Sequence, residues 1–346
     1  MCFFVRLNQL QSEVLRRKYL SSHVNSAVIE LTTECNKSCN FCYNAYGRNE
    51  STSQIKNPEH LISFLSEMGI KNIILSGGET LLYSKLFDCI QKFDSMGMRI
   101  TVITNGLLLD KETVKRLKHY NCYIRCTIDT MREAKRLIPL LKQHDYLDNS
   151  IVNFTYYDQD ISAFKELITY AHTSFTLRTD VNMAVGIECS SSILDQMVEI
   201  SIWCIEKRLL EKYNIVGQTI SALIDNYFRL SSLHSFNCSI CNDIKIDVNG
   251  LIYPCPFFKG HEWVIGNAKK AEWDGNKVKK LKEIVHDRIK FNPECQACDI
   301  NFICGGGCLI SLENKNRKND YCKNAQSCAI IRRIFEYLNA KFQIYR

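Results

Sequence analysis

Residues 27–42 read AVIELTTECNKSCNFC, and this stretch decides the fold. Ala27–Leu31 is mostly apolar and rich in β-branched residues, which predicts a buried strand. Cys35, Cys39 and Cys42 follow it directly with the spacing Cys-x3-Cys-x2-Cys. Three thiolates so close together can hold three corners of a cubane [4Fe–4S] cluster and leave one iron open. A zinc site that lacks one ligand, or three unrelated buried cysteines, are the alternatives.

From residue 27 to about 183, short β-branched runs alternate with amphipathic segments of helical period. This alternation is typical of βαβ units and a parallel sheet. Right-handed crossovers on six parallel strands curl the sheet towards a barrel, and ligands then bind at the carboxyl ends of the strands. The predicted strands are Ala27–Leu31, Asn72–Leu75, Arg99–Ile103, Tyr123–Ile128, Ile151–Thr155 and Thr176–Val181.

Capping residues locate two of the connecting helices. Asn57 precedes a predicted helix at Pro58–Met68, and Asp110 precedes one at Lys111–His119. Side-chain oxygens at these positions satisfy the free N–H groups of a first helical turn.

The pattern changes after residue 190. Residues 190 to about 232 predict one or two helices. Asn249-Gly250 then lies between two alternating runs, Ile244–Val248 and Leu251–Tyr253, and predicts a hairpin with a type I′ turn. Two further helices are predicted at Lys277–Lys290 and Ala329–Lys341. The expected organisation is an extension at 1–26, a barrel core at 27–189, a helical connection at 190–233, a small loop-rich domain at 234–328 and a closing helix at 329–346.

Composition narrows the class of protein. The chain has 346 residues, 18 cysteines and a net charge of +7. The charge is too small to indicate a nucleic-acid partner, and no apolar run is long enough to span a membrane. The N-terminus does not resemble a secretory signal. We therefore expect a cytoplasmic protein, where a reducing environment makes metal chemistry a better explanation of clustered cysteines than disulfides.

Polar residues are expected at the ends of the predicted strands, with Asn153 at the end of the fifth and Arg178 at the end of the sixth. Ser76-Gly77-Gly78-Glu79 ends the second strand and Thr104-Asn105-Gly106 ends the third. Together with the three-cysteine loop at its address after the first strand, these motifs resemble those of radical S-adenosylmethionine (radical SAM) enzymes. The resemblance implies an α/β fold, a partial (β/α)6 barrel similar to a TIM barrel, with a [4Fe–4S] cluster on Cys35, Cys39 and Cys42 that binds SAM.

The resemblance also implies contacts with SAM. Glu79 would bind the methionine amino group, and Phe41 would contact the adenine unless it only packs the loop. Asp129 suits the ribose hydroxyls, although it could equally cap the helix that starts near Met131. The full set of expected cofactor-binding residues is Phe41, Ser76, Gly77, Gly78, Glu79, Thr104, Asn105, Thr127, Asp129, Asn153 and Arg178.

The C-terminal cysteines form a second pattern, in which Cys295-x2-Cys298-x5-Cys304-x3-Cys308 is highly specific. It resembles the SPASM domain of radical SAM enzymes that modify peptides and proteins. By this resemblance, one auxiliary [4Fe–4S] cluster takes Cys238, Cys241, Cys255 and Cys308. The other takes Cys295, Cys298, Cys304 and either Cys328 or Cys322. A pair of zinc ribbons is the alternative, because four thiolates also suit Zn²⁺. The cysteines given no role are Cys2, Cys89, Cys122, Cys126, Cys189 and Cys204.

The resemblance implies reductive cleavage of SAM to a 5′-deoxyadenosyl radical, which takes hydrogen from a peptide, commonly a ribosomally made precursor. A crosslink or an oxidation would follow. The resemblance implies an electron donor of the flavodoxin or ferredoxin type as a partner. About 26 residues precede the first strand, too few for the leader-binding domain that many such enzymes carry, so a peptide leader would be recognised by the mouth of the barrel or by a separate protein. No catalytic acid or base is identified. The alternatives are a radical SAM enzyme for a small molecule, such as a tetrapyrrole side chain, and a non-catalytic cysteine-rich metal-binding protein.

One departure from the family counts against one chemistry. Sulfatase-maturing relatives place a catalytic Asp directly after the cysteine that corresponds to Cys255, whereas Pro256 follows here. The sequence therefore disfavours formylglycine formation.

Overall fold

The computed structural model describes residues 23–42, 54–175, 178–183, 191–207, 227, 240–258, 260–291, 293–304 and 325–343. Two compact units contain them. Val24–Ile187 and Cys241–Gly275 form the sheet unit, and the described residues of 188–240 and 276–346 form a helical unit. The hairpin region that we placed in a separate domain from residue 234 thus lies in the same unit as the barrel strands.

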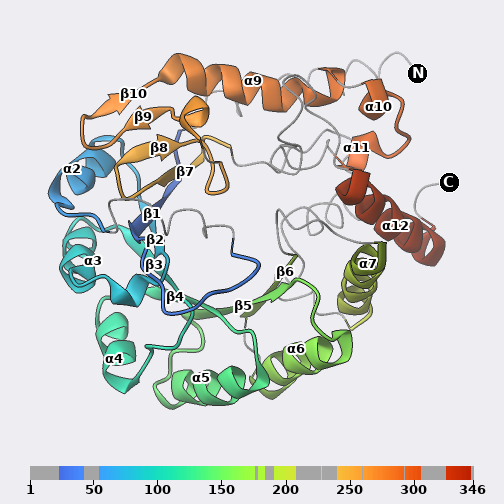
Figure 1. Cartoon of the computed structure of the whole chain (residues 1–346), viewed down its shortest axis with the longest axis horizontal. Helices are drawn as coiled ribbons and strands as arrows, with labels where there is room; N and C mark the ends of the chain where they lie inside the picture. Colours follow the sequence, from blue (N-terminus) through green and yellow to red (C-terminus); the bar gives the residue numbers. More distant parts are fainter. Residues whose placement is uncertain are drawn as a thin grey trace. The chain divides into compact units, whose positions relative to one another are not determined.

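A single open sheet of ten strands runs through the sheet unit, in the order β10-β9-β8-β7-β1-β2-β3-β4-β5-β6 (Figure 1). All neighbours among β1–β6 pair in parallel, and the prediction of an α/β partial barrel is confirmed. The bounds are β1 Ser26–Thr32, β2 Asn72–Gly77, β3 Arg99–Thr104, β4 Tyr123–Thr127, β5 Ser150–Tyr156 and β6 Arg178–Met183. We call the C-terminal end of these strands the mouth.

Helices connect the strands and surround them on the outside in Figure 1. They are α2 Glu59–Glu67, α3 Leu86–Ser95, α4 Lys111–His119, α5 Met131–Gln143 and α6 Ile161–Phe175, with a 3-10 turn, η2, at Thr80–Leu82. Asp110 caps α4 as predicted, since its carboxylate accepts from the N–H of Thr113 at 2.8 Å. Asn57 accepts from the N–H of Glu59 at 3.0 Å.

Burial alternates along the strands and distinguishes the two faces of the sheet. In β4 and β5 every second residue is buried, and these residues are apolar except for Ser150. The intervening residues are half-buried and mostly polar, and the strand register places them on one shared face. Because the helices cover the other face, this polar face lies towards the inside of the strand curve. Its half-buried members in β3, β4 and β5 are Thr101, Ile103, Tyr123, Arg125, Thr127, Ile151, Asn153 and Thr155.

The predicted hairpin extends the sheet beyond β1. β7 (Asp243–Ile246) pairs in parallel with β1 and antiparallel with β8 (Leu251–Tyr253). The predicted type I′ turn is wrong, because Gly250 has a positive φ of 85° whereas Asn249 does not. Asp247 explains the longer loop: its carboxylate accepts from the N–H groups of Asn249 and Leu251 at 2.9 and 2.8 Å. A 3-10 turn, η3 (His261–Trp263), β9 (Gly266–Asn267) and β10 (Glu272–Trp273) follow.

The helical unit contains α7 Ser191–Glu206, α9 Gly275–Phe291, α10 Pro293–Gln296, α11 Asn301–Cys304 and α12 Ala325–Phe342. α12 packs along α7, where Arg333 pairs with Asp195 and Tyr337 donates to Glu206. The predicted helices at Lys277–Lys290 and Ala329–Lys341 are confirmed within α9 and α12. Among the described helices, none has the length and apolarity to cross a membrane.

A buried ion pair joins the hairpin to the first strand. The Nζ of Lys245 on β7 lies 3.0 Å from Oε1 of Glu30 on β1, and the two side chains are 5% and 7% exposed. Removing one partner of such a pair leaves an uncompensated buried charge, which costs more than removing both.

We therefore predict that Lys245→Met lowers the free energy of unfolding by about 3–5 kcal/mol. Adding Glu30→Leu to this variant should recover most of the loss, because the carboxylate that lost its ion-pair partner is then removed as well. Urea unfolding of the proteins, followed by circular dichroism, measures both effects. Lys115→Met is the control, since Lys115 forms an exposed pair with Glu112 and should change stability by less than about 0.5 kcal/mol. Equal losses in the single and double variants would contradict this prediction.

Candidate functional site

The three-cysteine motif lies at the mouth, directly after β1. We call residues 33–42 the cysteine loop. Cys35, Cys39 and Cys42 are half-buried free thiols, and the N–H of Cys42 donates to the carbonyl of Cys39 at 3.2 Å. Burial raises the pKa of the Cys39 thiol; the negative charge of Asp129 adds to this rise, and the ammonium of Lys37 opposes it. The loop makes contacts with the ends of four successive strands, β2 to β5.

The end of β2 contacts the loop through backbone hydrogen bonds. The N–H of Gly78 donates to the carbonyl of Thr32, and the N–H of Glu79 donates to that of Glu34, both at 2.7 Å. A Cβ at Gly77 would lie 2.3 Å from the Thr32 carbonyl oxygen, and one at Gly78 would lie 2.3 Å from that of Glu34. Only glycines allow this close approach of the end of β2 to the end of β1 and to the cysteine loop.

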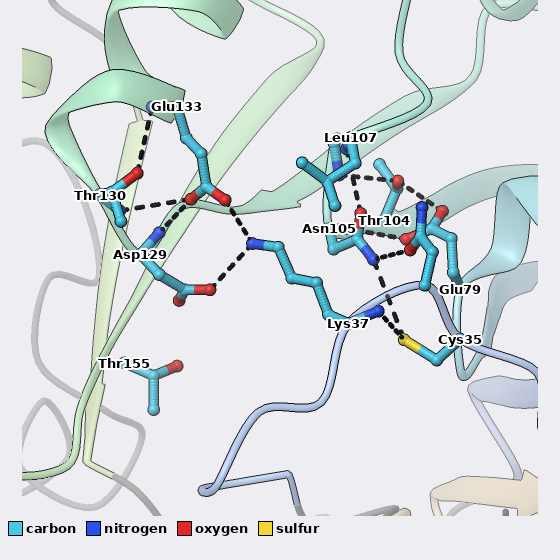
Figure 2. A network of polar contacts seen from close by, with 12 residues as sticks. Cys35, Lys37, Glu79, Thr104, Asn105, Leu107, Asp129, Thr130, Glu133 and Thr155 are labelled. Carbon is cyan, nitrogen blue, oxygen red and sulfur yellow. Dashed lines mark hydrogen bonds and ion pairs between the residues drawn. The ribbon is translucent and has the colours of Figure 1, made fainter.

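The carboxylate of Glu79 connects the end of β2 to the end of β3 (Figure 2). Glu79 is fully buried. Its Oε1 accepts from the hydroxyl of Thr104 at 2.6 Å and from the N–H of Leu81 at 3.0 Å, and its Oε2 accepts from the N–H of Asn105 at 2.7 Å. Burial raises the pKa of Glu79, while these hydrogen bonds act to lower it.

Asn105 continues the contact from β3 to the loop. Its Nδ2 donates to Oδ1 of Asn36 at 2.7 Å and lies 3.9 Å from the Sγ of Cys35. Its Oδ1 accepts from the N–H of Leu107 at 3.0 Å, which fixes the amide in this orientation. Thr104 and Asn105, both predicted from the turn that ends β3, thus lie beside the first cysteine.

Lys37 joins the loop to the end of β4 and the start of α5. Its Nζ lies 3.0 Å from Oδ2 of Asp129 and 2.6 Å from Oε1 of Glu133. Thr130 is the N-cap of α5 and forms a capping box with Glu133, so the alternative in which Asp129 caps this helix is wrong. Oδ1 of Asp129 is buried and accepts no hydrogen bond. Burial raises the pKa of Asp129, and Lys37 opposes that rise.

Phe41 forms the last contact, with the residue that follows β5. Its ring stacks on that of Tyr157, with 4.6 Å between the centroids and 29° between the planes. Sequence reasoning identified Phe41 but missed Tyr157 and Lys37. The one available signal for Tyr157 was an aromatic residue two positions after the predicted fifth strand; for Lys37 it was a basic residue between two cysteines.

The remaining predicted residues occupy different levels of the sheet. Ser76 is buried at the end of β2, opposite Glu30. Thr127 and Asn153 are paired neighbours on the inner face, and Oδ1 of Asn153 is buried and without a hydrogen-bond partner. Asn153 lies in the middle of β5, not at its end. The position predicted for Arg178 is wrong: it begins β6, opposite Ile151, because the strand runs further along the chain than predicted.

The C-terminal cysteines lie in both units. Cys241 is buried, and its N–H donates to the carbonyl of Pro254, next to Cys255, at 2.6 Å. In the helical unit, burial is the largest cause of the raised pKa of the Cys328 thiol. The negative charges of Cys304, Cys295 and Cys298 add to this rise, so these three thiols lie near Cys328. Arg332 donates from Nη2 to the Sγ of Cys298 at 3.4 Å and to Asp299 at 2.7 Å. Cys238, Cys308 and Cys322 lie outside the described residues.

The thiols at the mouth suit a cubane cluster better than a single metal ion. The described residues contain no group of three His, Cys, Asp or Glu side chains that could hold a metal ion. A cubane places each thiolate on a different iron, so its ligands need not converge on one point. Three half-buried free thiols on a fixed loop fit such a cluster, and the unpartnered oxygens of Asp129 and Asn153 fit a ligand with hydroxyl or ammonium donors. Four of the cysteines without a predicted role, Cys89, Cys122, Cys126 and Cys204, are buried, as expected for small apolar side chains.

Comparison with known proteins agrees with this arrangement. The family described as the Radical SAM superfamily matches residues 29–172. A probable GTP 3′,8-cyclase of Methanothermobacter marburgensis is 31% identical over 123 residues, which are 35% of this chain and 39% of that protein. The chain thus spans less than half of that relative. A cysteine-type anaerobic sulfatase-maturating enzyme of Clostridium perfringens is 20% identical, over 84% of this chain and 91% of its own.

Two solved structures share the fold over most of the chain. Native anSMEcpe with bound AdoMet and Cp18Cys peptide gives a TM-score of 0.69 at 16% identity, covering 91% of this chain and 97% of that one. Streptococcus suis SuiB bound to precursor peptide SuiA gives 0.62 at 20% identity, covering 92% and 80%. At these identities the likeness establishes the fold.

We predict that Gly78→Ala destabilises the protein by at least about 2 kcal/mol. The added methyl group meets backbone atoms of Thr33 and Glu34 that cannot rotate away, so it must push the cysteine loop from the end of β2. Urea unfolding gives the stability, and iron bound after anaerobic reconstitution reports on the loop. Gly275→Ala is the control, because its nearest atoms are 3.9 Å away. Wild-type stability and iron content in Gly78→Ala would contradict the prediction.

Proposed function

Residues 29–172 form a radical SAM domain, and from this premise we propose that the protein is a SAM-cleaving enzyme that modifies a peptide. The observation that carries the proposal is the cysteine loop held over the mouth by contacts from β2, β3, β4 and β5. A reduced [4Fe–4S] cluster held by Cys35, Cys39 and Cys42 would supply one electron for the cleavage of SAM into methionine and a 5′-deoxyadenosyl radical, which would take a hydrogen atom from the substrate.

The chain's own residues suit each part of SAM. Oε2 of Glu79 accepts one hydrogen bond from Asn105, and a carboxylate oxygen has room for a second, from the methionine ammonium. Asp129 and Asn153 offer buried, unpartnered oxygens for the ribose hydroxyls. Phe41 would meet the adenine with its ring already ordered by Tyr157. Arg178 begins its strand, and we do not assign it to SAM.

The auxiliary clusters are part of the proposal. Cys241 and Cys255 are brought close by the backbone bond at Pro254, which supports their use together in one ligand set. The electrostatic effect of Cys304, Cys295 and Cys298 on Cys328 supports Cys328 as the fourth ligand of the other. Fully ligated clusters suit electron transfer from a flavodoxin-type or ferredoxin-type donor, or structural support.

The peptide substrate is inferred from the relatives. The two solved structures that cover most of the chain hold peptides, and that fold similarity extends well beyond the radical SAM domain. The half-buried polar inner face, with Tyr123, Arg125 and Asn153, could bind peptide amides and polar side chains. Formylglycine formation is not proposed, because Pro256 occupies the position after Cys255.

We predict that the anaerobically reconstituted protein binds about twelve irons, from three clusters of four, and converts SAM to 5′-deoxyadenosine under dithionite. Replacing Cys35, Cys39 and Cys42 together by Ala should abolish the product and remove about a third of the iron, because the auxiliary ligands remain. Iron analysis and chromatography of the products measure these effects. Cys122→Ala, at a buried cysteine without an assigned role, should retain full activity.

Substrate class is tested with the same assay. A peptide encoded beside this chain's gene should accelerate formation of 5′-deoxyadenosine and change in mass. Zinc without iron in the wild type would overturn the enzyme assignment. Acceleration by a porphyrin and by no peptide would overturn the peptide assignment alone.

We further predict that Cys328→Ser loses more iron than Cys322→Ser. Cys328 lies near three other cysteines of its set, so its loss leaves one cluster short of a ligand. Iron analysis and the electron paramagnetic resonance (EPR) signals of the reduced proteins measure the difference. Because the SAM-binding loop is untouched, both variants should still produce 5′-deoxyadenosine. The reverse order of iron loss would assign the last ligand to Cys322.

A further inference from the structure

Lys37 stands out among the contacts of the cysteine loop because its ammonium faces two carboxylates, that of Asp129 after β4 and that of Glu133 in α5 (Figure 2). We propose that Lys37 is a positioning residue that holds the cysteine loop on β4 and α5 and neutralises Asp129 and Glu133, so that the adjacent cluster is easier to reduce. The inference rests on the proposed function, because it concerns the cluster assigned to this loop.

The geometry separates this ion pair from an ordinary surface pair. The side chains of Lys37, Asp129 and Glu133 are only 14–15% exposed, so solvent screens their charges weakly. Glu133 is further fixed by accepting from the N–H of Asp129 at 2.8 Å. The loop end is fixed too, since the N–H of Lys37 lies 3.4 Å from the Sγ of Cys35. The backbone of Lys37 is therefore fixed beside the Cys35 thiol, and its ammonium is fixed against Asp129 and Glu133.

The charge balance gives the direction of the effect. The three side chains together carry one positive and two negative charges when ionised. Without Lys37, two carboxylates would remain unneutralised beside the cluster, and adding an electron there would become harder. The reduction potential of iron–sulfur clusters depends on the net charge and hydrogen bonds around them. Lys37 therefore favours the reduced state that SAM cleavage requires.

Asp129 links this charge balance to the ligand site. Its Oδ2 is taken by Lys37, whereas its Oδ1 has no partner. The ion pair thus fixes the carboxylate in the orientation that presents Oδ1. A shift of the cysteine loop would move Lys37 and release Asp129 from this orientation. The position of the thiols and the orientation of Oδ1 of Asp129 are therefore coupled through the side chain of Lys37.

The test is a redox titration of the reconstituted full-length protein without SAM, followed by the EPR signal that SAM subsequently perturbs. We expect Lys37→Met to shift the midpoint potential to more negative values, because a positive charge is lost. Asp129→Asn should shift it to less negative values, and Lys37→Met with Asp129→Asn should lie between the single variants. Lys37→Arg should stay near the wild type, since it retains the charge.

Lys115→Met is the matched control, because it removes an exposed ion pair with Glu112 on α4. It should leave the midpoint potential and SAM cleavage unchanged. A residue that only braced the loop would not give opposite shifts for Lys37→Met and Asp129→Asn. Shifts of the same sign, or no shift in either, would overturn the inference. If Lys37→Met does not retain its cluster, Asp129→Asn decides: a less negative potential supports the inference, and an unchanged or more negative one overturns it.

The outcomes also separate this inference from the proposed function. Wild-type protein that binds no cluster on the loop, or does not cleave SAM, would remove the proposed function. Wild-type protein that does both, with potentials that do not depend on Lys37 and Asp129, would remove only the role of Lys37.

Discussion

The close approach of two backbone segments at the end of β2 is the constraint on which the site depends. Gly78 and Glu79 donate their N–H groups to the carbonyls of Thr32 and Glu34, which extends the pairing of β1 and β2 beyond the last residues of the strands. This pairing sets the direction in which the chain leaves β1 and enters the cysteine loop. A Cβ at Gly77 or Gly78 would clash with the backbone carbonyl oxygen of Thr32 or Glu34. The cysteine loop can therefore start against the end of β2 only because both of these residues are glycine.

Burial of a carboxylate is the cost of this arrangement, and the same carboxylate makes it rigid. Glu79 is removed from water and offsets the loss of hydration with hydrogen bonds from Thr104, Leu81 and Asn105. Leu81 follows β2, whereas Thr104 and Asn105 lie at the end of β3, so the carboxylate joins these two strand ends. The bond to the N–H of Asn105 also fixes that residue, whose side-chain amide reaches Asn36 and Cys35. The loop therefore depends on β2 and β3 together, and Lys37 and Phe41 extend that dependence to β4 and β5.

Local signals in the sequence were sufficient for the alternation of strands and helices and for the motifs that follow β1, β2 and β3. Strand–helix alternation and caps such as Asp110 depend on neighbours within a few residues. Contacts between distant residues have no such signal: the ion pair of Lys37 and Asp129 spans 92 positions, and Tyr157 meets Phe41 only once β5 is in register. Arg178 was misplaced because polar and apolar residues are mixed along Thr176–Val181, so the bounds of the strand could not be read from them. The turn at Gly250 was misjudged because Asp247 offers its backbone an alternative loop.

The register of β7 on β1 separates the two groups of cysteines in the sheet unit. β7 starts opposite Ser26, the first residue of β1, and Cys241 lies just before it, whereas Cys35 follows the last residue of β1. Seven residues of strand, at a rise of about 3.3 Å each, span about 20 Å. A group held by Cys241 and Cys255 would therefore lie at the opposite end of the strand from the mouth and could not share a ligand with SAM there. The polar inner face of β3, β4 and β5 lies between the levels of these two ends and so separates the two groups of cysteines.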